Sequence, residues 1–229
     1  MKKKTVVLTG AGVSAESGLS TFRDAGGLWE GHNVMDVASP EGWRKNKKLV
    51  LDFYNERRRQ LTNVKPNDAH LALVKLETKY DVTIITQNVD DLHDRAGSSN
   101  VIHLHGELNK ARSVSHPDLI YELNGKDINI GDKCEKGSQL RPHIVWFGEM
   151  VSMMEEAVRY SLEADIFVII GTSLVVYPAA GLIEFVPEYS PKYIIDPIKP
   201  DYNIHHSNLI FIQEKATKGT TGLVKKLLN

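Results

Sequence analysis

The chain has 229 residues, 41% of them hydrophobic and 25% charged, and a formal net charge of −1, which is the profile of an ordinary globular protein with a sizeable core. The balanced charge excludes a strong basic field that would attract nucleic acid or an acidic membrane surface. The longest apolar run, near 166–170, is far too short to span a bilayer. Polar residues also follow the lysines at 2–4 too soon for a signal peptide, so the cytoplasm is the expected compartment.

Apolar periodicity predicts strands that alternate with helices along the chain. Short runs rich in β-branched residues predict strands at 5–9, 82–86, 101–104, 144–146, 166–170, 193–195 and 209–212. Helical spacing predicts helices at 41–61, 67–79, 152–162 and 222–228. Residues 110–140 are polar with little periodicity, which indicates an inserted, loop-rich module. The alternation elsewhere predicts an α/β fold, a Rossmann-like parallel sheet with helices on both faces.

A glycine-rich turn, Gly-Ala-Gly-Val-Ser-Ala at 10–15, follows the first predicted strand. Glycines at such a turn let the backbone approach a pyrophosphate, whose charge the next helix N-terminus stabilises. A tight strand-to-helix turn without any ligand is the alternative. A dehydrogenase would continue to a second strand that ends in a ribose-binding acid. Residues 20–29 instead form a glycine-containing segment that suits a loop over a dinucleotide.

Polar side chains follow the predicted strand at 82–86. Gln87 and Asn88 carry amides that hold hydroxyl groups in fixed directions, and Asp90 is an acceptor for an amide. Since ligands collect beyond the carboxyl ends of strands in open α/β sheets, these residues indicate a binding site. An aspartate helix cap preceded by polar turn residues explains the same pattern equally well.

Two histidines close the next strand. Alternation places His103 and His105 on one face, so one of them is expected to be packed or metal-bound. A lone histidine is more often structural than catalytic. His105 is the better candidate for a base, because Gly106 frees space beside it and its intrinsic pKa suits proton transfer near neutrality.

In this order along the chain, these segments resemble the sirtuin family. The resemblance rests on 10–18 with the Thr-Phe-Arg at 21–23, Gln-Asn-Val-Asp at 87–90, His-Gly at 105–106, Arg-Pro-His at 141–143 through Phe-Gly-Glu at 147–149, and Gly-Thr-Ser-Leu at 171–174. It is nearest to the short bacterial deacylases that also remove succinyl and malonyl groups.

The resemblance implies a protein-lysine deacylase that consumes NAD and releases nicotinamide and an O-acyl-ADP-ribose. His105 would act as general base for a ribose hydroxyl, and Asn88 would be the second catalytic residue. Phe22 would help to close a water-poor pocket, and Asp90 would anchor the leaving nicotinamide. The cofactor-binding residues implied by the match are Gly10, Ala11, Gly12, Ala15, Thr21, Phe22, Arg23, Trp29, Gln87, Asn88, Asp90, Gly171, Thr172, Ser173, Asp196 and Ala216.

The resemblance also implies a site for the acyl-lysine substrate. Residues 145–149 match the stretch on which a substrate peptide adds as an extra strand. Tyr54 and Arg57, three apart on a predicted helix, match the residues that bind acidic acyl groups, although the basic run 57–59 is also explained by solvation. The substrate-binding residues so implied are Ala38, Tyr54, Arg57, Val145, Phe147, Gly148, Glu149 and Val175.

Two features depart from the family pattern. Asp196 stands where an asparagine commonly contacts the adenosine ribose. The family's four zinc-binding cysteines are missing from the module, where Cys134 is the one thiol of the chain, so an internal disulfide is excluded and zinc is not expected. His116 and His143 lack the usual pairing for a zinc site.

The expected organisation is one catalytic domain over 1–229, with a Rossmann-like part at 1–29, 80–108 and 143–229 and a small part at 30–79 and 109–142. Acyl-lysine proteins or peptides are the expected partners, without specific nucleic acid or membrane, and a monomer is expected. Two rival functions stay open. A non-enzymatic NAD or ADP-ribose sensor would not need His105, and a redox dehydrogenase would need the missing second-strand acid.

Overall fold

A computed structural model describes residues 2–20, 28–29, 31–199 and 208–229. Its main sheet has six parallel strands in the order β11-β10-β9-β1-β4-β5. The order reverses between β1 and β9, a switch point where α/β sheets bind ligands beyond their carboxyl ends. The strands are β1 (Lys4–Thr9), β4 (Asp81–Thr86), β5 (Val101–His103), β9 (Ile166–Ile170), β10 (Lys192–Ile195) and β11 (Leu209–Ile212).

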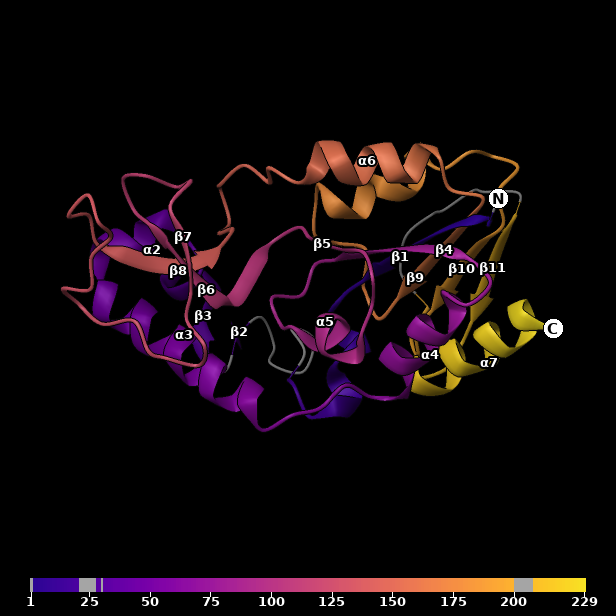
Figure 1. The fold of residues 1–229 in the computed structure, drawn as a ribbon, viewed down its shortest axis with the longest axis horizontal. Helices are drawn as coiled ribbons and strands as arrows, with labels where there is room; N and C mark the ends of the chain where they lie inside the picture. Colours follow the sequence, from indigo (N-terminus) through magenta and orange to yellow (C-terminus); the bar gives the residue numbers. More distant parts are fainter. Residues whose placement is uncertain (1, 21–27, 30, 200–207) are drawn as a thin grey trace.

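Helices cover both faces of this sheet (Figure 1), which confirms the predicted Rossmann-like α/β fold. Helices α4 (Asp68–Leu76) and α7 (Ala216–Leu228) pack on one face, and α6 (Met154–Leu162) with the 3-10 helix η3 (Ala179–Phe185) packs on the other. The sheet is buried between two apolar clusters, which explains why β1, β4 and β9 read as nearly continuous apolar runs. No helix among the described residues is long and apolar enough to cross a membrane.

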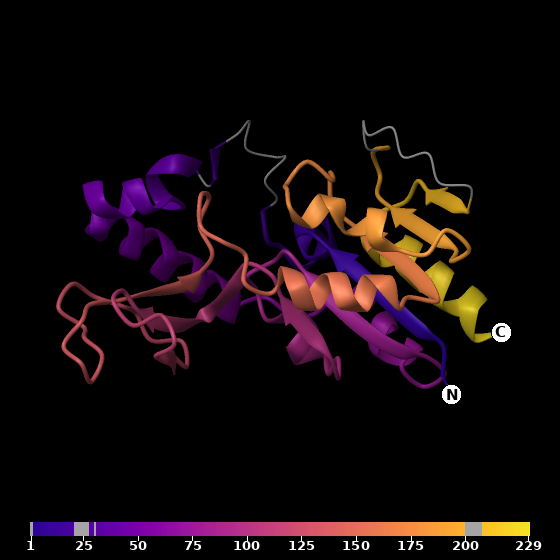
Figure 2. The same cartoon turned by 90° about the horizontal axis from the view of Figure 1, so that it is seen from above.

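A second, smaller part of the molecule lies beside the main sheet (Figure 2). It contains an antiparallel sheet, β7-β6-β8, built from β6 (Gly106–Ser113), β7 (Ile120–Glu122) and β8 (Leu140–Ile144). Helices α2 (Pro40–Lys45) and α3 (Lys47–Thr62) pack on it around Trp43, Tyr54 and Trp146. The prediction of a loop-rich module was therefore incomplete, and the strand predicted at 144–146 lies earlier, at 140–144.

Four short elements complete this part and its junction with the main sheet. Strands β2 (Leu28–Trp29) and β3 (His32–Asn33) form a two-stranded pair, although no strand was predicted there, and α1 (Val34–Val37) follows. Helix α5 (Leu92–Ala96) connects β4 to β5.

Local hydrogen bonds and packing explain where the helices depart from the predictions. The helix expected at 41–61 is divided at Asn46, whose side chain accepts a hydrogen bond from Leu49 N and so caps α3. The last helix begins at Ala216 rather than 222. Gly219, which weakens the helical signal, is needed because a Cβ there would collide with Ile195.

Candidate active site

The carboxyl ends of β1, β4, β9 and β10 open into a cavity of about 640 Å³, which continues between the main sheet and the smaller part. That volume is typical of small-molecule sites. The cavity brings together most of the residues singled out in the sequence, namely Gly10, Ala11, Gly12, Ala15, Trp29, Ala38, Tyr54, Arg57, Gln87, Asn88, Asp90, His105, Val145, Phe147, Gly148, Glu149, Gly171, Thr172, Ser173, Asp196 and Ala216.

Four predicted residues do not join this list. Val175 is exposed and does not line the cavity, whereas its neighbours Ser173 and Val176 do. Thr21, Phe22 and Arg23 lie outside the described residues.

The glycine-rich turn lies against the end of β9. Gly12 N donates to Gly171 O at 2.8 Å, and a Cβ on Gly12 would lie 2.6 Å from Gly171 Cα. A Cβ on Gly10 would lie 2.7 Å from Thr172 Cβ. These glycines are therefore required by the packing of two turns, a reason different from the predicted approach to a phosphate. The expected α-helix is also absent here, since two 3-10 turns, η1 (Ala11–Val13) and η2 (Ala15–Ser17), follow Gly10.

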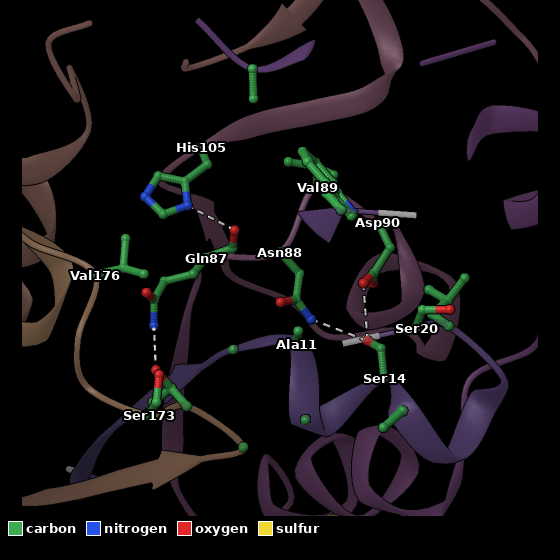
Figure 3. Close-up of a pocket in the computed structure, with 18 of the residues that line it drawn as sticks. Ala11, Ser14, Ser20, Gln87, Asn88, Val89, Asp90, His105, Ser173 and Val176 are labelled. Atoms are coloured by element: carbon green, nitrogen blue, oxygen red, sulfur yellow. Dashed lines mark hydrogen bonds between the residues drawn. The ribbon is translucent and has the colours of Figure 1, made fainter. Parts of the chain in front are cut away.

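Ser14 joins the two polar segments at the centre of the site (Figure 3). Its hydroxyl donates to Asp90 Oδ2 at 3.0 Å and accepts from Asn88 Nδ2 at 3.1 Å. Leu92 N donates to the other oxygen of Asp90 at 3.1 Å. Burial raises the pKa of Asp90, and these hydrogen bonds partly offset that effect. Because the amide nitrogen of Asn88 is engaged, its carbonyl oxygen remains as the acceptor offered to a ligand.

His105 has a defined tautomer. Its Nδ1 lies 2.9 Å from the carbonyl oxygen of Gln87, an acceptor, so Nδ1 carries the proton and Nε2 keeps its lone pair. Burial lowers the pKa of His105, and the hydrogen bond to Gln87 offsets part of this shift. A neutral ring with a basic Nε2 beside the cavity is the state that a general base requires.

The surroundings of His105 differ from the predictions at Gly106 and agree with them at His103. Gly106 has a φ of +82°, and a Cβ there would collide with the carbonyl oxygen of His143. It thus allows β8 to approach β6 and does not free space for a ligand. His103 is the packed histidine of the pair, with Nε2 3.1 Å from Asp94 Oδ2. Burial opposes protonation of His103, but Asp94 raises its pKa.

The carboxyl ends of β9 and β10 supply further polar groups. Thr172 Oγ1 accepts from Gln87 Nε2 at 3.2 Å and from Leu174 N at 3.3 Å, so its own hydrogen can be donated to another group. Asp196 is 2% exposed and accepts from Ile198 N at 2.9 Å. Ala216 begins α7, whose first turn is capped by Glu16 through a 3.0 Å hydrogen bond from Thr217 N.

The other end of the cavity lies in the smaller part of the molecule. Tyr54 is fully buried and its hydroxyl accepts from Trp146 Nε1 at 3.1 Å. Arg57 is half-buried, its guanidinium lies 5.2 Å from the Phe53 ring, and burial lowers its pKa. The three arginines at 57–59 have different environments. Arg58 is buried and donates to the backbone of β6, and Arg59 is an exposed partner of Asp127, so the alternative of a solvated basic run applies to Arg59 alone.

Segment 145–149 is held at both ends. Val145 N donates to His105 O and Phe147 N to Ala38 O, each at 2.9 Å. Both carboxylate oxygens of Glu149 accept from Arg141, at 2.6 and 3.0 Å. Burial alone would raise the pKa of Glu149, but Arg141 and the Trp146 N–H hold it below its ordinary range. The Glu149 side chain therefore fixes this segment while its backbone stays at the cavity.

Several residues of the site were missed in the sequence. Ser14 belongs to the glycine-rich turn at 10–15, but the sequence analysis gave it no role. Nothing in the residues around it indicates a contact with residues 88–90. Glu16 and Trp146, which lie inside the segments 10–18 and 145–149 but were given no role of their own, also line the cavity, as do Val176 and Tyr177. No group of three or more histidine, cysteine or acidic side chains that could hold a metal occurs among the described residues. The absence of zinc remains a prediction.

Comparisons with known proteins agree with this geometry. A model of the Sir2 family matches residues 10–178. An NAD-dependent protein deacylase of Helicobacter pylori is 54% identical over 226 residues, covering 99% of this chain and 98% of the relative. A protein of the same description from Bacteroides thetaiotaomicron is 54% identical over 231 residues, covering 99% of this chain and 98% of its own length.

Solved structures show the same fold. A complex of a Sir2 homologue with NAD superimposes with a TM-score of 0.88 at 39% identity, covering 99% of this chain and 90% of the other. A Sir2 protein bound to an acetylated peptide gives a TM-score of 0.82 at 28% identity, covering 98% and 93%. From the family match over the greater part of the chain and the relatives that match along nearly its whole length, we conclude that the protein belongs to the Sir2 family.

Proposed function

We propose that this protein is an NAD-dependent protein-lysine deacylase that removes acetyl groups and acidic acyl groups such as succinyl and malonyl. The observation that carries the proposal is His105, whose Nδ1 is fixed by the Gln87 carbonyl while Nε2 remains a base at a cavity shared with Asn88 and Asp90. A sensor that only binds NAD has no use for this arrangement.

The residues of the cavity fit NAD. Buried acceptors and donors on Asn88, Asp90, Thr172 and Asp196 lie along a cavity at the switch point of the sheet, where dinucleotides bind. The hydroxyl, phosphate and amide groups of a dinucleotide can form further hydrogen bonds with side chains of this kind. When bound, NAD supplies the ADP-ribosyl group that accepts the acyl chain, with nicotinamide as the leaving group.

The protein's own contribution is to bind, orient and move a proton. Asn88 and Gln87 orient the ribose hydroxyls, and Asp90 accepts from the carboxamide of nicotinamide. His105 Nε2 takes the proton of a ribose hydroxyl, and the positive charge that develops is stabilised by the Gln87 carbonyl on Nδ1. Segment 145–149 offers its backbone to an acyl-lysine peptide.

Arg57 and Tyr54 select the acyl group in this proposal. Both line the end of the cavity that lies in the smaller part. A guanidinium can meet a carboxylate with two parallel hydrogen bonds, and a phenol can add a third. Ala38, which is small and buried beside them, leaves room for a longer acyl chain.

The proposed partners are acyl-lysine proteins or peptides in the cytoplasm, and the proposed state is a monomer. We also propose the division into a Rossmann-like part at 1–29, 80–108 and 143–229 and a small part at 30–79 and 109–142. The small antiparallel sheet at 106–144 lies close to two of these boundaries.

Release of nicotinamide from NAD distinguishes the three candidate functions. With an acetyl-lysine or succinyl-lysine peptide present, the purified protein should form nicotinamide and deacylated peptide in equal amounts. A sensor would bind NAD without releasing nicotinamide, and a dehydrogenase would form NADH. Either of those results would overturn the proposal.

A further inference from the structure

The Tyr54 hydroxyl can give its hydrogen to a ligand. Trp146 Nε1 lies 3.1 Å away, and an indole N–H only donates, so the tyrosine oxygen is the acceptor of that bond. Among the residues that the structure describes, none accepts a hydrogen bond from the hydroxyl in return. Burial raises the pKa of Tyr54, so the hydroxyl keeps its proton at neutral pH. A fully buried donor is thus left at the wall of the cavity.

Trp146 is held so that its N–H has a fixed direction. Its backbone N donates to Glu149 Oε2 at 2.8 Å. The Arg141 guanidinium lies 3.2 Å from the centre of its ring, and the Trp43 ring lies 5.7 Å away. Arg112 and Arg141 both bind Glu149, so the anchor of the Trp146 backbone is itself fixed.

We propose that Trp146 is a positioning residue that orients the Tyr54 hydroxyl as a donor toward the far end of the acyl chain. The consequence is selectivity for acyl groups that end in a carboxylate. A carboxylate gives the buried O–H an acceptor, whereas a methyl end leaves it without one, and an unpaired buried donor costs free energy. The inference rests on the proposed function and assigns Trp146 a role that acts through Tyr54.

The test compares succinyl-lysine with butyryl-lysine peptides, which have acyl chains of equal carbon number and differ at the end. For Trp146→Phe, which removes the N–H and keeps an aromatic ring, the ratio of kcat/KM for succinyl over butyryl should fall at least roughly fivefold, the factor that one hydrogen bond is worth. The fall should come mainly from a higher KM for the succinyl peptide. Tyr80→Phe, which removes a hydroxyl that donates to Leu227 O and does not line the cavity, is the control and should leave the ratio within about twofold.

A double-mutant cycle tests whether Trp146 acts through Tyr54. Tyr54→Phe alone should lower the ratio at least as much, and adding Trp146→Phe to it should lower the ratio no further. An unchanged ratio in Trp146→Phe would overturn the inference. So would a fall caused by Trp146→Phe that is equally large in the wild type and in the Tyr54→Phe variant. Should Trp146→Phe fail to fold, an unchanged ratio in Tyr54→Phe overturns it equally. If the wild type removes no acyl group with NAD, the proposed function fails, whereas deacylation without a succinyl preference refutes the inference and leaves the deacylase activity standing.

Discussion

His105 shows how one backbone contact prepares a side chain for the catalytic role that we propose for it. The Gln87 carbonyl is fixed by its place after β4, and it determines which nitrogen of the imidazole carries the proton. Burial keeps the ring neutral. The side chain is therefore a base before any ligand arrives.

Replacing His105 by alanine should lower the deacylation rate by about 10²- to 10⁴-fold, because a general base acts on the transition state far more than on binding. NAD affinity should change little. Peptide deacylation and NAD binding by calorimetry measure the two effects separately. Wild-type turnover by the variant would remove His105 from the mechanism.

Arg57 is the residue on which acyl selection depends in our account. Arg57→Met should reduce activity on a succinyl-lysine peptide by about 1.5–3 kcal/mol, the scale of a hydrogen bond to a charged group. Most activity on an acetyl-lysine peptide should remain. Arg59→Met, two residues along the same helix and paired with Asp127 at the surface, is the control and should change neither. Equal losses on both peptides in Arg57→Met would show that Arg57 serves structure instead.

At the scale of elements, hydrogen bonds within the turns of the small part surround Cys134 and the antiparallel sheet. Cys134 is buried, and its thiol donates to Ser113 Oγ at 3.3 Å. Around it, Ser115 N donates to Ser138 Oγ, and Cys134 N donates to Ser138 O. Hydrogen bonds of the turns themselves thus join β6 to the segment before β8.

The purified protein should contain no stoichiometric zinc, and a strong chelator should leave its melting temperature unchanged. The reason is that one thiol cannot close a site that normally needs four ligands. Elemental analysis and a thermal melt with and without chelator check this. One zinc per chain, or a lower melting temperature after chelation, would contradict the account.

Helices α4 and α5 bury a pair of histidines under the active site. The rings of His70 and His93 lie 4.7 Å apart, and His93 Nε2 lies 3.1 Å from Thr9 Oγ1. Burial lowers the pKa of His70 to about 4 and that of His93 well below its ordinary value. Both rings are therefore neutral in the folded protein at neutral pH.

This pair predicts a loss of stability in mild acid. The unfolded chain binds protons near pH 6.5 and the folded pair does not, so the free energy of unfolding should fall as the pH drops from about 6.5 toward 4. Each unit of lowered pKa corresponds to about 1.4 kcal/mol. Urea titrations across this range should show a smaller slope for His93→Gln than for the wild type. His116→Gln, away from the pair, is the control, and identical slopes for the wild type and His93→Gln would refute the prediction.

For the whole molecule, sequence reasoning predicted what apolar runs and end-of-strand polar residues can show. Buried parallel strands such as β1 and β9 are apolar on both faces and stand out. Strand β6 did not stand out, because its apolar side chains are limited to Leu108 and Ala111. A bulge between Glu107 and Ala111 also interrupts its pairing with β8. A strand of this kind is recognised by its pairing with β7 and β8, which its own residues do not indicate.

The same distinction applies to the site. His105 and Asn88 could be predicted, since each follows a recognisable strand and the motifs match a family. The contacts of Ser14 with Asn88 and Asp90, and of Trp146 with Tyr54, could not, because they join residues 74 or more positions apart. The pairing of β1 with β4 creates the contacts of Ser14, and the packing of α3 against the segment after β8 creates that of Trp146 with Tyr54.

The central claim is that the molecule couples the breakdown of NAD to the removal of an acyl group, and product stoichiometry tests it most directly. The purified protein, incubated with NAD and an acyl-lysine peptide, should give nicotinamide, free-lysine peptide and O-acyl-ADP-ribose in equal amounts by mass spectrometry. Free-lysine peptide formed without NAD, or nicotinamide released equally well without the peptide, would contradict the account.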